Sequence, residues 1–215
     1  ANLNYRDLQG IVRKSDNKVF FPRLEVNHSM FDGRLKFNAN VSGYQQRYFA
    51  GADGSSYEGS VYRNALIYNP TDPLKDDNGT WTEHIDKTEY ANPVALLQET
   101  KGENRNTDFR TYGTVTWFPV KDLSLNLLGS RGVNNSTRGY YETKKHYSTI
   151  HDGRNGYASR GTTRSEENLM ELTANYNKII NDHQFTALAG YSWRKFNSEN
   201  YYMQNWDFPV DDYSY

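Results

Sequence analysis

The feature that most constrains the fold of this chain is a recurring alternation of apolar and polar residues. The clearest cases have an apolar or small residue at every second position, in 35–41, 123–127, 170–176 and 185–193. Weaker cases are 3–5, 24–30 and 109–117. Successive side chains of a strand point to opposite faces, so these segments predict about seven strands, each with one apolar face.

Composition supports a β-rich fold and excludes several functions. Aromatic residues make up 15% of the 215 residues although the mean hydropathy is −0.94. Tyr and Phe suit a half-buried pleated surface, and their abundance argues against disorder. The net charge of −1 gives no basic bias, so we expect no nucleic-acid partner. The chain has no cysteine, which excludes disulfides, thiolate metal ligands and Cys nucleophiles.

The expected connections alternate between short and long. Short turns are predicted at Phe31-Asp32-Gly33-Arg34, with Asp-Gly as the hairpin signal, and at 119–122 and 181–183. Long polar excursions are expected at 9–21, 49–106 and 131–166, and in the tail after 196. Outer-membrane barrels have short turns at one end and long loops at the other.

A soluble antiparallel sheet also alternates, with one face on a core and one in water. The strict short–long order is unlike a sandwich, whose turns come at regular spacing. The apolar positions include many small residues: Ala39, Gly113, Gly129, Ala174, Ala187 and Ala189. Aromatic residues gather at strand ends, as in interfacial girdles: Phe20, Phe21, Phe31, Tyr44, Tyr48, Trp117, Phe118, Tyr191 and Trp193.

We therefore predict an all-β fold, an antiparallel up-and-down transmembrane β-barrel segment whose long extracellular loops contain short helices. The alternative is a soluble β-sheet carbohydrate-binding module. Bacterial single-chain barrels have even strand numbers of at least about 8. An open sheet edge leaves backbone groups unsatisfied in lipid. Residues 1–215 are therefore expected to form part of a larger barrel domain.

Two short helices are expected inside the long excursion 49–106. Ser60 can cap a helix over 61–68 that Pro70 ends. Asn92 can cap a second helix, with Pro93 at its first position. Two apolar helical turns can pack on each other, so the loop is expected to be folded.

The same loop carries a family resemblance. The stretches Ala65-Leu66-Ile67-Tyr68-Asn69-Pro70-Thr71-Asp72-Pro73 and Asn92-Pro93-Val94-Ala95-Leu96 resemble the SusC/RagA family of TonB-linked outer-membrane transporters. Further matching stretches, in the family's order, are Leu3-Asn4-Tyr5-Arg6-Asp7, Gln9-Gly10-Ile11-Val12, Asn155-Gly156-Tyr157-Ala158-Ser159-Arg160, Glu171-Leu172-Thr173-Ala174-Asn175-Tyr176-Asn177 and Ala187-Leu188-Ala189-Gly190-Tyr191-Ser192.

The resemblance implies a 22-stranded barrel with an N-terminal plug in the Gram-negative outer membrane, importing oligosaccharides or oligopeptides. It implies a SusD-like surface lipoprotein as partner, outer-membrane lipid around the barrel, and energy relayed by TonB through a plug region not in this chain. It implies no enzymatic activity and no cofactor. The expected lumen-facing positions are Lys36, Asn38, Asn40, Asn126, Glu171, Asn175 and Asn177.

Site candidates are few. Asp76-Asp77-Asn78-Gly79 suggests a calcium loop, but Leu74 and Ile85 occupy its first and twelfth ligand positions, so a polar turn is favoured. His146 and His151 lack a third metal ligand. We predict no metal site and no catalytic group. The candidate ligand-binding residues are loop aromatics, whose alternative role is packing the loops or the partner: Trp81, Tyr90, Tyr140, Tyr141 and Tyr147, with Tyr157, Tyr201, Tyr202 and Trp206 beside them.

Overall fold

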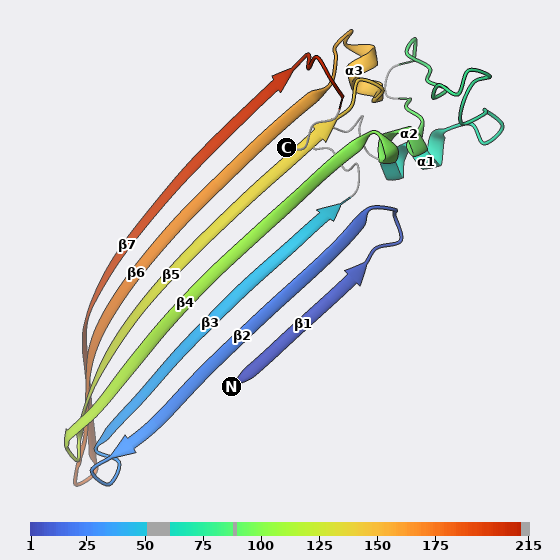
Figure 1. Ribbon diagram of the computed structural model, residues 1–215. Coiled ribbons are helices and arrows are strands. Elements are labelled where there is room, and N and C mark those ends of the chain that lie inside the picture. Colours follow the sequence, from blue (N-terminus) through green and yellow to red (C-terminus); the bar gives the residue numbers. More distant parts are fainter. Residues whose placement is uncertain (51–60, 88–89, 212–215) are drawn as a thin grey trace.

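The computed structural model describes residues 1–50, 61–87 and 90–211. It is one antiparallel sheet whose seven strands follow one another in chain order. The strands are β1 (Asn2–Gln9), β2 (Ser15–Met30), β3 (Leu35–Ala50), β4 (Thr100–Val120), β5 (Leu123–Glu142), β6 (Tyr157–Ile180) and β7 (His183–Trp206) (Figure 1). The prediction of a seven-stranded, all-β, up-and-down meander is confirmed.

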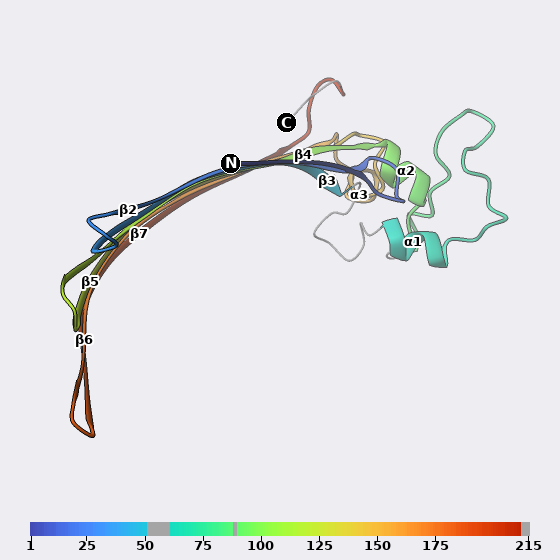
Figure 2. The ribbon, with the colours of Figure 1, turned by 90° about the horizontal axis from the view of Figure 1, so that it is seen from below.

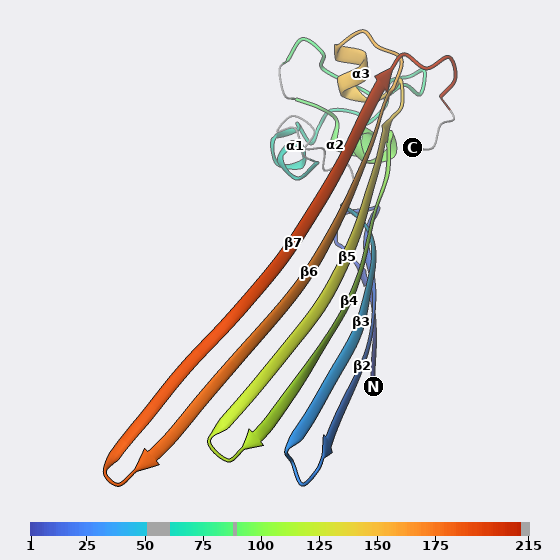
Figure 3. The same ribbon diagram turned by 90° about the vertical axis from the view of Figure 1, so that its left-hand side faces the viewer.

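The sheet is a single curved layer (Figure 2). Three short helices gather at one end: α1 (Val61–Ile67), α2 (Pro93–Gln98) and α3 (Tyr147–His151). The short turns lie together at the other end (Figure 3). No helix within the described ranges is both long and apolar enough to cross a membrane.

The register collects the apolar residues into rows that cross five strands. One row is Leu35, Trp117, Leu125, Ala174 and Ala189; the next is Phe37, Val115, Leu127, Leu172 and Tyr191; a third is Ala39, Gly113, Gly129, Met170 and Trp193. We call the face that carries these three rows the apolar face. Its side chains stay accessible, with Phe37 39% and Tyr191 60% exposed. Within the described residues, no second layer covers these rows (Figures 2 and 3).

The opposite surface, which we call the polar face, carries the intervening residues. One of its rows is Asn27, Asn38, Thr114, Leu128, Glu171 and Ser192. Its side chains bond to one another: Asn38 Nδ2 donates to Asn27 Oδ1 at 2.5 Å, and Thr116 Oγ1 donates to Asn126 Oδ1 at 2.7 Å. The expected lumen-facing residues all lie on this face.

The predicted short turns are present, and left-handed backbone closes two of them. Phe31, Asp32 and Gly33 have φ values of 55°, 51° and 87°, and the amide of Arg34 donates to the carbonyl of Phe31 at 3.0 Å. Asn181 has φ 53° in the turn between β6 and β7. Gly, Asp and Asn tolerate this conformation best, which explains their use in such tight links.

The predicted loop boundaries are wrong, because the strands run much further. β2 begins at Ser15, β5 continues to Glu142, β6 begins at Tyr157, and β7 continues to Trp206. Beyond the apolar rows polar residues become frequent on both faces, so the alternation fades although the backbone pairing continues. Six of the aromatics assigned to loops therefore lie on strands: Tyr140, Tyr141, Tyr157, Tyr201, Tyr202 and Trp206.

The two helices predicted in the long excursion are confirmed as α1 and α2. α1 ends three residues before Pro70, and the proposed cap Ser60 lies outside the described residues. A small core of Val61, Ala91, Leu96 and Tyr147 joins both helices to α3. The loop is therefore folded, as expected. The sequence did not predict α3, which has only five residues.

Candidate functional site

The connection between β3 and β4 is held together by two buried asparagines. Asn64 Oδ1 accepts from the amide of Ala91 at 2.9 Å. Asn92 Oδ1 accepts from the amides of Val94 at 3.0 Å and Ala95 at 3.3 Å, which caps α2 as predicted. Asn92 Nδ2 also donates to the carbonyls of Leu74 and Thr82. One side chain therefore ties three segments of the loop together.

The segment proposed as a calcium loop is a tight turn. Asp76 Oδ1 accepts from the amides of Asn78 at 2.9 Å and Thr80 at 2.8 Å, and Gly79 has φ 78°. A β-bridge between Lys75 and Trp81 closes the turn. The carboxylate is thus occupied by backbone donors, in agreement with the polar-turn interpretation.

Two of the five candidate ligand-binding aromatics keep part of their surface exposed. Trp81 donates from Nε1 to Glu99 Oε1 at 2.6 Å, and Lys75 Nζ lies 4.4 Å from the centre of its ring system. Tyr90 stacks on Tyr68 with ring centroids 5.1 Å apart, and its hydroxyl accepts from the amide of Asn69 at 2.7 Å. Both rings are oriented by polar partners and remain partly accessible.

The other three candidates are buried within the chain. Tyr140 donates its hydroxyl to Glu142 Oε1 at 2.7 Å, and Tyr141 donates to Asp211 Oδ1 at 2.8 Å. Tyr147 on α3 donates to the carbonyl of Lys87 at 2.8 Å. The contacts of Tyr141 and Tyr147 join segments that are far apart in sequence, whereas that of Tyr140 stays within β5. The structure therefore does not bring the five aromatics together in one pocket.

Glu83 and His146 are two loop residues whose pKa values differ from their ordinary values. Burial raises the pKa of the Glu83 carboxyl to about 7, opposed by the amide of Asn92, which donates to Oε2 at 2.8 Å. Among the described residues, Glu83 Oε1 has no hydrogen-bond partner. Burial lowers the pKa of His146, opposed by the nearby carboxylates of Glu142 and Glu99. His146 caps α3 by accepting from the amide of Ser148, so its role there is structural.

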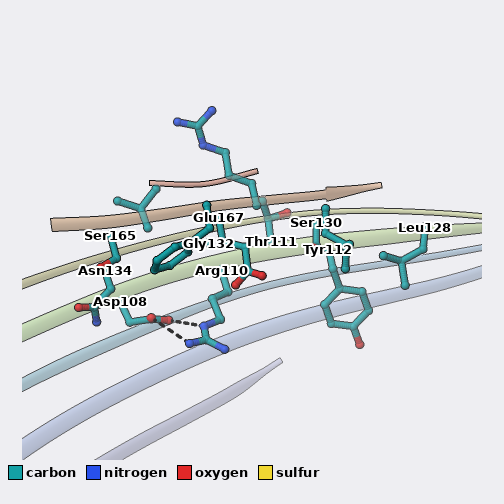
Figure 4. Close-up of a pocket in the computed structure, with 14 residues that line it drawn as sticks. Asp108, Arg110, Thr111, Tyr112, Leu128, Ser130, Gly132, Asn134, Ser165 and Glu167 are labelled. Carbon is teal, nitrogen blue, oxygen red and sulfur yellow. Dashed lines mark hydrogen bonds and ion pairs between the residues drawn. The ribbon is translucent and has the colours of Figure 1, made fainter. Parts of the chain in front are cut away.

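The polar face carries a hollow of about 460 Å³ over β4, β5 and β6 (Figure 4). Arg110 donates two hydrogen bonds to Asp108, from Nε to Oδ1 at 2.8 Å and from Nη2 to Oδ2 at 3.3 Å. Glu167 accepts from Arg194 of β7. Tyr112 and Phe196 add aromatic surface. A wall with both charge signs beside aromatic rings suits an amphiphilic ligand or a neighbouring polypeptide segment.

Sequence reasoning did not select the residues of this hollow. Arg110 and Tyr112 lie on a segment whose apolar positions alone were used, and Glu167 follows a range assigned to a loop. Continuing the period of two past the apolar rows would have placed all three on the polar face.

The described residues contain no group of three His, Asp or Glu side chains placed to hold a metal ion. His151 Nδ1 faces Asp152 Oδ1 at 3.1 Å in an exposed pair, while His146 Nδ1 faces Ser148 Oγ at 2.8 Å and Glu142 Oε2 at 3.5 Å. The two histidines thus have separate partners.

Neither a protein-family model nor a curated protein matches the chain. Its fold matches solved structures of the RagAB peptide importer. The closed-closed state of the importer gives a TM-score of 0.70 at 19% sequence identity. A structure described as the RagAB peptide transporter gives a TM-score of 0.74 at 20% identity, and the open-open state gives a TM-score of 0.73 at 20% identity. The matches cover 97–98% of this chain but only 23–24% of the matched chains. The chain therefore spans about a quarter of the proteins that it resembles.

At this identity the likeness establishes the fold. The resemblance to SusC/RagA proteins, drawn from short sequence motifs, is confirmed at that level by the match to RagAB structures. The matched proteins are described as an importer and a transporter, and none as an enzyme.

Proposed function

We propose that this chain forms part of the barrel wall of a SusC-like TonB-dependent transporter in the Gram-negative outer membrane. The observation that carries the proposal is the division of one single-layer sheet into an apolar and a polar face. In such a barrel the apolar rows meet lipid, and the hydrogen-bonded polar face lines an aqueous lumen. The match to RagAB structures supports it.

The two ends of the sheet give the orientation. Short turns face the periplasm and long loops face outward in barrels of this class. We call the folded region around α1, α2 and α3 the mouth, and it is therefore the extracellular end. The outer edges of β1 and β7 would pair with further strands, because an open edge cannot stand in lipid. The plug and its link to TonB belong to regions outside this chain.

The transported substrate is an oligopeptide or an oligosaccharide, handed over by a SusD-like surface lipoprotein. The fold match to a peptide importer makes oligopeptides the class to test first. Trp81 and Tyr90 are the candidate ligand contacts, because their rings are partly exposed at the mouth. The chain acts by binding and conduction and catalyses no reaction.

A soluble carbohydrate-binding module is the other reading of an alternating sheet. Such a module needs a covering layer on its apolar face. Within the described ranges Phe37 and Tyr191 have none, which favours the transporter.

Spin labels placed singly at positions 35–41 of the full-length protein in outer membranes test the proposal. The label at Phe37 should be relaxed mainly by oxygen, which concentrates in lipid. The label at Asn38 should be relaxed mainly by a water-soluble nickel chelate. Protection of both positions from both reagents would indicate a second protein layer and would refute the barrel wall.

A further inference from the structure

Two clusters of arginine and glutamate lie on the apolar face beyond its apolar rows, toward the loops. Triad one is Arg47, Glu103 and Arg105; triad two is Arg131, Glu166 and Arg164. Residues an even number of positions apart on a strand point to the same face. Arg47 therefore lies on the face of Val41, Arg105 on that of Phe109, and Arg131 on that of Gly129, and this is the face that carries Phe37.

In each triad a single carboxylate lies between two arginines. Arg47 and Arg105 are directly opposite across β3 and β4, and their Nε atoms donate to different oxygens of Glu103, which is 8% exposed. In triad two, Arg164 Nη2 lies 2.5 Å from Glu166 Oε1 and Arg131 Nη2 lies 3.8 Å from Oε2. The four arginine side chains are 58–67% exposed. The arginines are oriented by the protein while their outer surfaces stay open.

Each triad has an excess of positive charge and of donors. Two guanidinium groups carry ten N–H donors between them, and one carboxylate can accept only some of these. Each triad therefore keeps one net positive charge and unused donors on its outward side. Lys195 and Glu199, which lie on the same face of β7, add one charge of each sign, and Glu199 is directly opposite Arg164.

The height of the triads matches the headgroup layer of a bilayer. A strand tilted as in membrane barrels rises about 2.5 Å per residue along the membrane normal. Arg131 lies two residues beyond Gly129, and Arg105 four beyond Phe109. These spacings put Arg131 about 5 Å past the third row, and Arg105 about 10 Å past Phe109, the last apolar residue of β4 on this face, where polar headgroups begin.

We propose that the two triads bind the phosphate groups of outer-leaflet lipid. A phosphate offers the oxygen geometry that a guanidinium fork matches, and paired forks on a rigid sheet discriminate it from zwitterionic headgroups. The lipid source follows from continuity, since the triads extend the face that meets hydrocarbon. The inference rests on the proposed function, because it requires the apolar rows to face lipid.

Native mass spectrometry of the full-length protein, purified from outer membranes, tests the proposal. The protein is released from micelles doped with phosphatidate, with phosphatidylcholine, or with phosphatidate plus inorganic phosphate. The variant Arg131→Gln/Glu166→Gln/Arg164→Gln removes one net positive charge and leaves no unpaired carboxylate. The control Arg23→Gln/Glu25→Gln/Lys36→Gln also removes one net positive charge and leaves no unpaired carboxylate, but on the polar face.

The wild type should retain phosphatidate at least about fivefold more than phosphatidylcholine, and inorganic phosphate should not reduce this. The triad variant should lose the preference and the control should keep it. Equal retention of the two lipids, equal loss in the control, or displacement by inorganic phosphate would each overturn the proposal. A triad variant that changes only the number of protein copies in the complex would assign the surface to a second copy instead. Absence of the wild type from the outer-membrane fraction would refute the proposed function itself.

Discussion

Phe37 of β3 lies directly opposite Val115 of β4 on the apolar face, and Phe37 is 39% exposed although it sits at mid-sheet. Its chain neighbour Asn38 lies on the polar face and donates from Nδ2 to Asn27 Oδ1 and Glu25 Oε1. Adjacent residues thus occupy opposite environments across a sheet one layer thick.

A charge at position 37 should therefore oppose membrane insertion, whereas one at position 38 should not. We expect Phe37→Arg to cost about 2–4 kcal/mol of folding free energy in lipid, as for arginine near the midplane of a barrel. Asn38→Arg is the matched control and should cost well under half as much. Urea titration of the full-length protein in vesicles, followed by tryptophan fluorescence, measures both. Equal costs at the two positions would contradict the assignment of faces.

The strand pattern could be predicted where one face meets an apolar medium. The strand segments around Phe37 and Trp193 alternate clearly between apolar and polar residues, so the approximate number of strands and their order followed from the sequence. The polar continuations, such as Arg131 to Glu142 on β5, carry no such signal because both of their faces are polar. Their pairing depends on backbone hydrogen bonds to β4 and β6, which residue type hardly reveals.

The exposure of the candidate aromatic residues could not be predicted from the sequence. Loop aromatics were selected, but whether a tyrosine is exposed depends on partners distant in sequence, such as Asp211 for Tyr141. The cap at Asn92 was predictable because an asparagine before proline is a local signal. The hydrogen bonds of Asn92 to Leu74 and Thr82 join residues distant in sequence, so they could not be predicted.

Replacing Asn92 should loosen the mouth. Asn92→Ala removes the cap of α2 and two bonds to loop carbonyls, so we expect a loss of about 1–2 kcal/mol of local stability. Hydrogen exchange at Val94 and Ala95 should speed up by about five- to thirtyfold, the same energy expressed as a rate ratio. Asn78→Ala, in the exposed turn, is the control. Unchanged exchange in the first variant would show that the cap does not hold the loop.

The mouth should weaken as the pH rises toward and past 7. The pKa of Glu83 is raised to about 7 from an ordinary 4.5, so the folded carboxyl keeps its proton where the unfolded one has lost it. The resulting stability is fully present below about pH 4.5 and is lost as the pH passes 7. After allowance for solvent screening, we expect roughly 1–2 kcal/mol across this range.

Protection factors at Val94 and Ala95, taken between pH 5 and pH 8, measure this change. Glu83→Gln should abolish the pH dependence, since an amide does not titrate, while Asp77→Asn in the exposed turn should keep it. A wild-type loop whose protection is the same at both pH values would contradict the raised pKa.

Trp81 offers the sharpest distinction between ligand contact and packing. Its indole bonds to Glu99 and is covered on one side by Lys75, which leaves part of the ring free at the mouth. If this ring stacks on substrate, Trp81→Ala should weaken oligopeptide or oligosaccharide binding about five- to tenfold, and Trp81→Phe should weaken it less because a flat ring remains. Tyr147→Phe loses a buried hydrogen bond to Lys87 and should leave affinity unchanged. Calorimetry with the full-length protein measures all three. Equal affinities for wild type and Trp81→Ala, with faster loop exchange in the variant, would assign Trp81 to packing alone.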